Sequence, residues 1–195
     1  IPQLTLATQA ATKAGAFIVK ARNQPSLQIT GKGKGDLCTE LDAGSQEIIL
    51  NCLREGGVDL GDVFPEESLA DYKTGDIAQL QPKTRGWLVD PLDGTADVGL
   101  HYETRRTAVM IAYREDGETI FSVVHFPFSH ETYYAVQGRG AFFQGRKFTV
   151  PGTFTEIKGS GITFNLQSDF RNFSPFIWNL WNNLTGVVRK GRRPG

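Results

Sequence analysis

The strongest constraint on the fold is a change of hydrophobic period near Gly86. Before it, residues 4–20 and 42–53 place apolar side chains at helical spacing, which predicts two amphipathic helices. After it, short segments rich in β-branched and aromatic residues follow one another, with Asp116-Gly117 as a strong hairpin turn. Helices followed by tightly connected strands predict an α+β fold in which the helices pack on an antiparallel sheet. The expected strands are residues 87–89, 107–113, 119–124, 132–136 and 141–143.

Composition excludes several classes of protein. The chain has 195 residues, of which 39% are hydrophobic and 22% charged, and its formal net charge is zero. A neutral chain lacks the basic excess of proteins that bind a nucleic acid polymer. No apolar run is long enough to cross a bilayer, so no membrane association is expected. Cys38 and Cys52 form neither a disulfide framework nor a metal-ligand pair, which favours a reducing, cytoplasmic location.

Two further stretches bear on the organisation of the chain. The Gly31–Gly35 stretch, which reads G-K-G-K-G, is expected to interrupt regular structure as a loop, and it lacks the spacing of a P-loop. After Pro151, a short strand at 161–164, a helix rich in Trp and Phe at 169–184 and another strand from 187 are expected. We therefore predict a first α+β subdomain at residues 1–151 and the truncated start of an α/β subdomain at residues 152–195.

The segment Trp87 to Thr95, which reads W-L-V-D-P-L-D-G-T, carries the most informative chemistry. Asp90 and Asp93 follow an apolar strand, and Mg²⁺ prefers oxygen ligands. On one tight turn, these carboxylates would reach a shared point, and the carbonyl of Leu92 would add a third oxygen. Gly94 would let the backbone approach a phosphate, with the N–H groups of Gly94 and Thr95 as donors. The alternative is that Asp, Pro and Gly only form a turn.

Two upstream segments supply further carboxylates. Glu66 and Glu67 follow the apolar pair Val63-Phe64, and an exposed pair of glutamates is usually a solvated surface. Asp42 stands at the start of the second expected helix, where an N-cap is the simplest interpretation. Neither segment identifies a site by itself.

Together the three segments resemble the inositol monophosphatase superfamily, which includes the 3'(2'),5'-bisphosphate nucleotidases. The family pattern D-x-x-T-x-x-D, then G-E-E-S, then W-x-[IV]-D-P-[IL]-D-G-T occurs here in order, with proline replacing the glycine of the second motif. Residues 133–145 are similar to the family's Y-x-A-x-x-G-x-G-A-F-x-N-G. The resemblance covers about residues 4–151. It implies a layered, sugar-phosphatase-like fold and lithium-sensitive, Mg²⁺-dependent hydrolysis of a small phosphomonoester.

The resemblance also implies a role for each matching residue. Substrates of the inositol monophosphate or 3'(2'),5'-bisphosphate nucleotide type are implied, together with two or three Mg²⁺ ions. Thr95, hydrogen-bonded to Asp42, would orient the attacking water, with Glu66 assisting, and the backbone of Gly94 and Thr95 would bind the phosphate. The implied metal ligands are Glu66, Asp90 and the carbonyl of Leu92 for one ion, and Asp90 with Asp93 for a second.

The sequence departs from the family downstream. Residues 96–98 and 103–106 differ from the family's, and the W-D-x-A motif, whose aspartate completes the second metal site, has no counterpart. Trp178-Asn179 and Trp181-Asn182 are the nearest matches, but they come too early in the chain. The alternative function is therefore an inert truncated homologue or fragment that binds or dimerises. We expect a homodimer, because a truncated second layer would leave apolar surface exposed.

Overall fold

The computed structural model describes residues 1–22, 29–33, 36–66, 85–95, 98 and 107–150. Contacts group Ile1–Thr149 into one unit and Val150–Gly195 into another. The strands and helix expected after Pro151, and the downstream Trp-Asn pairs, lie outside the described residues. The division at residue 151 and the α/β character of the second part stay predictions.

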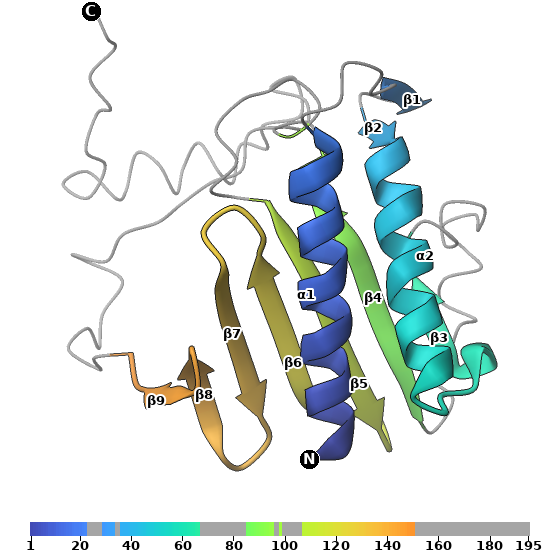
Figure 1. Cartoon of the computed structure of the whole chain (residues 1–195). Coiled ribbons are helices and arrows are strands. Elements are labelled where there is room, and N and C mark those ends of the chain that lie inside the picture. Colours follow the sequence, from blue (N-terminus) through green and yellow to red (C-terminus); the bar gives the residue numbers. More distant parts are fainter. Residues whose placement is uncertain (23–28, 34–35, 67–84, 96–97, 99–106, 151–195) are drawn as a thin grey trace, which may run out of the picture. The chain divides into compact units, whose positions relative to one another are not determined.

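Two helices cover one face of a sheet, as Figure 1 shows. Helix α1 spans Pro2–Arg22 and packs against strands β5 and β6, while α2, Glu40–Glu55, packs against α1 and β4. The buried face of α1 consists mainly of small residues, which lets the helix approach the sheet closely. Both predicted helices are confirmed and are longer than the hydrophobic pattern indicated. The buried residues of α1 are Ala7, Ala10, Ala11, Ala14, Gly15 and Ile18.

The sheet has seven strands in the order of the sequence, β3 to β9. All neighbours are antiparallel except β3 and β4, which are parallel, so the sheet is mixed rather than purely antiparallel. The predicted strands and the α+β class are otherwise confirmed. The strands are β3 Val63–Pro65, β4 Arg85–Asp93, β5 Ala108–Glu115, β6 Glu118–Phe126, β7 Glu131–Val136, β8 Gly140–Phe143 and β9 Arg146–Phe148.

The backbone corrects the predicted loop at Gly31 and confirms the predicted hairpin turn at Asp116-Gly117. Ile29–Gly33 and Asp36–Thr39 pair as the antiparallel strands β1 and β2, so the predicted loop at Gly31 was wrong for Gly31–Gly33. Glycine lowers strand propensity but does not prevent pairing when a partner strand is adjacent. The hairpin at Asp116-Gly117 is confirmed, with φ angles of 50° and 82° that suit a type I′ turn.

An aromatic cluster fills the core between the helices and the sheet. The rings of Trp87, Tyr113 and Phe121 come from three adjacent strands, and their centroids are separated by 5.1 to 5.8 Å. Registered pairs in the sheet place these residues on the same face, toward the helices. This cluster anchors the start of β4, whose other end carries the predicted metal ligands.

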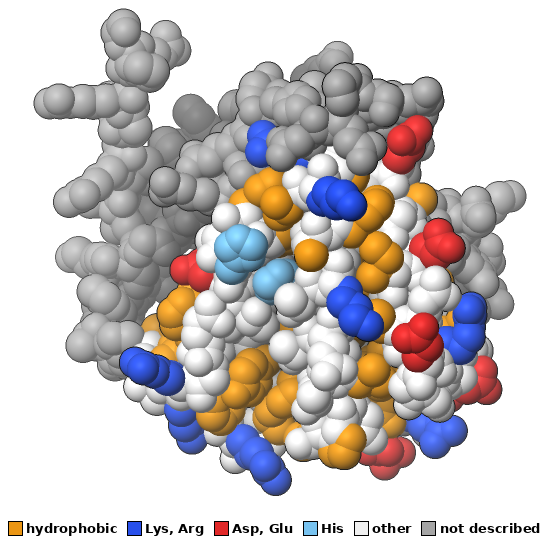
Figure 2. Space-filling view, viewed as in Figure 1, with side chains coloured by type: hydrophobic (Ala, Val, Ile, Leu, Met, Phe, Trp, Pro, Cys, Tyr) orange, Lys and Arg blue, Asp and Glu red, His pale blue; other side chains and the backbone are white. Residues whose placement is uncertain are grey.

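The helix-bearing face carries charges of both signs. Figure 2 shows Lys and Arg side chains interspersed with Asp and Glu over the described part of this face. This distribution agrees with the zero net charge of the sequence.

Among the described residues, no helix is both long and apolar enough to span a membrane.

Gly15 tests how closely α1 packs on the sheet. A Cβ atom at this position would lie 2.6 Å from Cδ2 of His125, whose buried ring is held by a 2.9 Å hydrogen bond between Nδ1 and the Thr132 hydroxyl. Glycine-to-alanine substitution in an exposed helix stabilises by about 1 kcal/mol. Here we expect Gly15→Ala to lower the free energy of unfolding by about 1–3 kcal/mol, because the added methyl group would overpack the core against His125. Urea denaturation measures the change.

The exposed α1 residue Ala16 offers the matched control. Ala16→Gly is expected to lower stability by about 1 kcal/mol through helix propensity alone. A Gly15→Ala variant more stable than the unaltered chain would contradict the close packing.

Candidate metal and phosphate site

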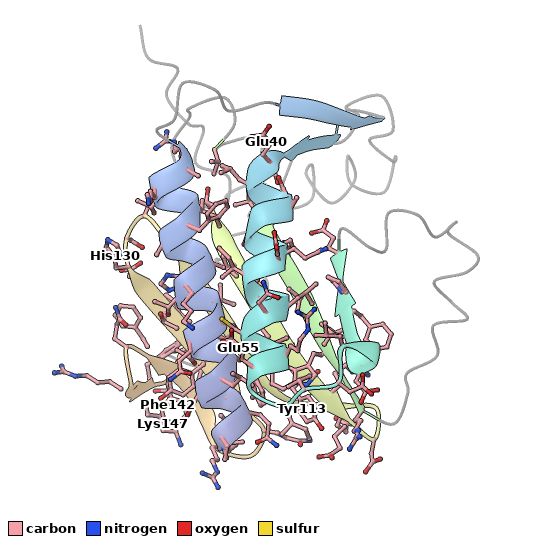
Figure 3. The ribbon with its side chains drawn as sticks, turned by 45° about the vertical axis from the view of Figure 1, so that its right-hand side comes forward. Glu40, Glu55, Tyr113, His130, Phe142 and Lys147 are labelled. Atoms are coloured by element: carbon pink, nitrogen blue, oxygen red, sulfur yellow. The ribbon has the colours of Figure 1, made fainter. Side chains whose placement is uncertain are left out.

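The candidate site forms where the end of β4 meets the beginning of α2. Figure 3 shows Glu40 at the end of α2 next to β2, and Glu55 at the opposite end. Asp42 lies within the first turn at the Glu40 end of α2. It is therefore inside the helix, and the interpretation of Asp42 as the N-cap was wrong. Its side chain is 1% exposed and faces the core. A buried carboxylate on a helix facing a strand end is a strong candidate for function, because burial without a task is costly.

A register shift in β4 brings Asp90 and Asp93 to the same side of the sheet. Asp90 pairs with Met110 and Asp93 with Ala108, so three steps along β4 match two steps along β5. In a regular strand, residues three apart point to opposite faces. One extra residue in the bulge restores the same face, and Pro91, which has no N–H, suits that irregular position. The expected tight turn is therefore a bulged strand end, and the turn begins at Gly94.

Three carboxylates surround the end of this strand. Asp90 lies close enough to Glu66 and to Asp93 for their side chains to raise its pKa. Burial, then the charge and hydrogen bond of Glu66, then the charge of Asp93 raise the pKa of Asp90 from its ordinary value near 3.8 to about 7. The backbone N–H of Leu92, 3.1 Å from Oδ1 of Asp90, acts in the opposite direction. Like charges gathered in this way favour a bound cation.

On the α2 side, the hydroxyl of Thr95 connects the loop to the helix. Its oxygen lies 2.8 Å from Oδ1 of Asp42 and 3.0 Å from the carbonyl oxygen of Leu92, and the hydroxyl donates toward both acceptors. Thr95 and Asp42 are 53 residues apart in sequence, so tertiary packing alone brings them together. The pairing expected from the family resemblance is thus present in the structure.

A second hydrogen bond joins α2 to the same loop, and sequence reasoning missed it. Ser45, fully buried one turn after Asp42, donates to the carbonyl of Pro91 at 2.6 Å. The helical spacing of Asp42 and Ser45 is the signal that could have identified it, since residues three apart share a helix face. The two polar residues occupy the first turns of the buried face, and the later residues of that face are Ile49, Cys52 and Leu53.

Gly94 has the conformation that the sequence analysis required of a glycine. Its φ angle is 82°, in the left-handed region that side chains disfavour. Thr95 and Val98 are helical, and the N–H of Val98 donates to the Gly94 carbonyl at 3.3 Å. The N–H groups of Gly94 and Thr95 therefore lie where a helical turn begins, a position suited to an anion.

Within the described residues, no group of three His, Cys, Asp or Glu side chains has the geometry of a preformed metal site. Glu66 and Asp93 are exposed and Asp90 is half-buried. The chemistry of the donors nevertheless fits a hard cation, since all are oxygen ligands and the charges of Glu66 and Asp93 act on Asp90. Of the residues that depart from the family sequence, 96, 97 and 103–106 lie outside the described residues.

Comparison with known proteins identifies the lineage. The model of the inositol monophosphatase family matches residues 2–172. The chain belongs to the inositol monophosphatase family. By lineage it is therefore a phosphatase, which confirms the resemblance found in its motifs.

Two named relatives illustrate this membership. The Nus factor SuhB of Pasteurella multocida is 31% identical over 198 residues, an alignment that covers 100% of this chain and 69% of the relative. A solved IMPase of Thermotoga maritima is 26% identical, with a TM-score of 0.62 over 78% of this chain and 55% of the other. This inositol monophosphatase homologue thus spans about half the length of that solved structure.

A more distant structure confirms the fold alone. The chain described as SaIMPase-II is 20% identical, with a TM-score of 0.68 over 97% of this chain and 64% of the other. The layered α+β arrangement of helices on a sheet is therefore the family's fold.

The gathered carboxylates yield a prediction about stability. A carboxyl group whose pKa is raised by folding stabilises the native state below its unfolded pKa, and this contribution is lost as the pH rises from about 4 through about 7. Asp90→Asn removes the charge, so without metal we expect the variant to melt at a higher temperature than the unaltered chain at pH 8. The difference should shrink toward pH 5. Thermal melting in the presence of a chelator measures it.

The same series with Mg²⁺ completes the test. Mg²⁺ should raise the melting temperature of the unaltered chain and leave that of Asp90→Asn unchanged. Asp116→Asn, in the exposed hairpin turn, is the control and should respond to Mg²⁺ like the unaltered chain. An Asp90→Asn variant that melts lower at pH 8 without metal would contradict the proposed charge clustering.

Proposed function

We propose that this chain carries the water-orienting and metal-binding side of a Mg²⁺-dependent phosphomonoesterase. The observation that supports this most is the juxtaposition at the end of β4, where Asp90 lies between Glu66 and Asp93 while Thr95, two residues further, bonds to Asp42. Strand pairing or core packing alone requires neither the carboxylate cluster nor the buried Asp42. The carboxylate cluster would bind a cation, and the buried Asp42 would help to orient an activated water.

The proposed ligands are those that the family resemblance implies. Glu66, Asp90 and the carbonyl of Leu92 would hold one Mg²⁺, and Asp90 with Asp93 would help hold a second, of two or three in all. The Leu92 carbonyl accepts from Thr95, and its second lone pair remains suited to a metal. When bound, Mg²⁺ lowers the pKa of a water and offsets the negative charge of the phosphate oxygens.

Thr95 is the proposed water-orienting residue. Because its hydroxyl hydrogen is shared between the Asp42 carboxylate and the Leu92 carbonyl, the lone pairs of the same oxygen are available to accept a hydrogen bond from the attacking water. Asp42 thereby fixes the orientation of the hydroxyl. Glu66, which lies close to Asp90, would assist. The N–H groups of Gly94 and Thr95 would bind the phosphate as it gains charge.

The substrate class is proposed from the lineage. Inositol monophosphates and 3'(2'),5'-bisphosphate nucleotides are the candidates, and lithium is the expected inhibitor. The proposed state is a homodimer in the cytoplasm; these two proposals rest on the sequence.

A second candidate is a non-catalytic binding role. An alignment that covers 100% of this chain and 69% of a protein named Nus factor SuhB favours keeping it. Measured hydrolysis of a phosphomonoester distinguishes the phosphatase from the non-catalytic binding role.

The deciding experiment is phosphate release from inositol 1-phosphate and from adenosine 3',5'-bisphosphate, with Mg²⁺ and with or without Li⁺. Lithium-sensitive turnover of either is expected. Thr95→Val should lower kcat by about a hundredfold or more, since the water loses its positioned acceptor, while Mg²⁺ affinity is retained. Thr119→Val, at an exposed position of β6, is the control and should leave kcat unchanged. A folded protein with no turnover of either compound supports the binding role.

A further inference from the structure

The hydrogen bonds around Pro91 form a continuous connection from the core of α2 to the metal-binding carboxylates. Ser45 donates to the Pro91 carbonyl at 2.6 Å, and the next N–H, that of Leu92, donates to Oδ1 of Asp90 at 3.1 Å. The carbonyl of Pro91 and the N–H of Leu92 belong to the same peptide unit. Because a peptide unit is planar, fixing one of these groups fixes the direction of the other.

This peptide unit lies in the bulge of β4, where the strand ladder does not hold it. The register of β4 with β5 is interrupted between Asp90 and Asp93, and this stretch contains the Pro91–Leu92 peptide unit. Regular strand residues have their peptide planes set by their neighbours. At the bulge another group must set the plane, and Ser45 is in position to do so.

We propose that Ser45 is a positioning residue that orients the Asp90 carboxylate through the Pro91–Leu92 peptide. The inference rests on the proposed function, because it takes Asp90 as a metal ligand. Ser45 touches neither metal nor substrate. It acts on Asp90 as outer hydrogen-bond partners act on metal ligands in general, by fixing the direction of the ligand's lone pairs.

Ser45 and Asp42 thereby hold different parts of the loop that follows Asp90. Asp42 holds the side chain of Thr95, and Ser45 holds the backbone before Leu92, both from adjacent positions on the buried face of α2. The proposed water-orienting hydroxyl and the proposed metal-binding carboxylate are thus both positioned by hydrogen bonds from the same helix. Sites held in this way keep their geometry better than sites on loops alone.

Ser45→Ala removes the hydroxyl, and two further variants separate positioning from packing. Cys52→Ala also deletes one heavy atom from the buried face of α2, two turns from the loop. Ser45→Thr retains a hydroxyl and tests rescue. Magnesium affinity is measured by calorimetry with Mg²⁺ alone, the Mg²⁺ dependence of kcat by phosphate release, and protection of the Leu92 amide by hydrogen exchange.

In Ser45→Ala we expect the Kd for Mg²⁺ to rise about ten- to a hundredfold. Saturating Mg²⁺ should restore kcat, and the Leu92 amide should exchange faster. Cys52→Ala should lower the melting temperature without changing either the Kd or the exchange of Leu92. Ser45→Thr should restore affinity and protection together.

Several results would overturn the proposal. Equal losses of Mg²⁺ affinity in Ser45→Ala and Cys52→Ala would reduce Ser45 to a packing role. Unchanged Leu92 exchange in Ser45→Ala would break the connection through the peptide. Magnesium binding that Ser45→Ala leaves unaltered refutes the positioning role alone, whereas a protein that binds no Mg²⁺ refutes the proposed function as well.

Discussion

The arrangement of the site depends on the attachment of the end of β4 to the first turns of α2. Two hydrogen bonds make this attachment, from Thr95 to Asp42 and from Ser45 to Pro91. Both involve buried polar groups on the helix, which would destabilise the fold if they lost their partners. The aromatic cluster at the other end of β4 fixes the strand in the sheet. The strand is therefore fixed at both ends, and the bulge between them has a single geometry.

The fold could be predicted from local patterns because its elements are consistent with them. Alternating apolar residues and the turn at Asp116-Gly117 indicate the hairpins directly, and apolar residues at helical spacing indicate both helices. The short strands β1, β2, β3 and β9 escaped this reasoning. Strand β3 has three residues, too few for a period, and its parallel pairing with β4 depends on tertiary contact. The β1 strand includes Gly31 and Gly33, whose low propensity is overridden by pairing with β2.

The site was predictable in part, for a different reason. Asp90, Asp93 and Glu66 were identifiable because the types of side chain and their order match a family pattern. The bulge that directs both aspartates to the same side was not, because a D-P-x-D spacing suits a turn as well as a strand end. Ser45 was also missed. A serine on a helix is ordinary in sequence, and its partner, a backbone carbonyl 46 residues away, leaves no mark in the residue pattern.

The places where this chain breaks local rules coincide with the candidate site. A proline interrupts a central strand, a carboxylate is buried in a helix face, and burial together with the neighbouring charges of Glu66 and Asp93 raises the pKa of Asp90. Each of these features lowers stability when considered alone, and natural sequences tolerate such conflicts mainly where function requires them. Elsewhere in the described sheet, for example at Val109, Ile111 and Val123, buried apolar side chains alternate as strand geometry requires. All three features lie at or next to the irregular end of β4, which supports the candidate site independently of the family motif.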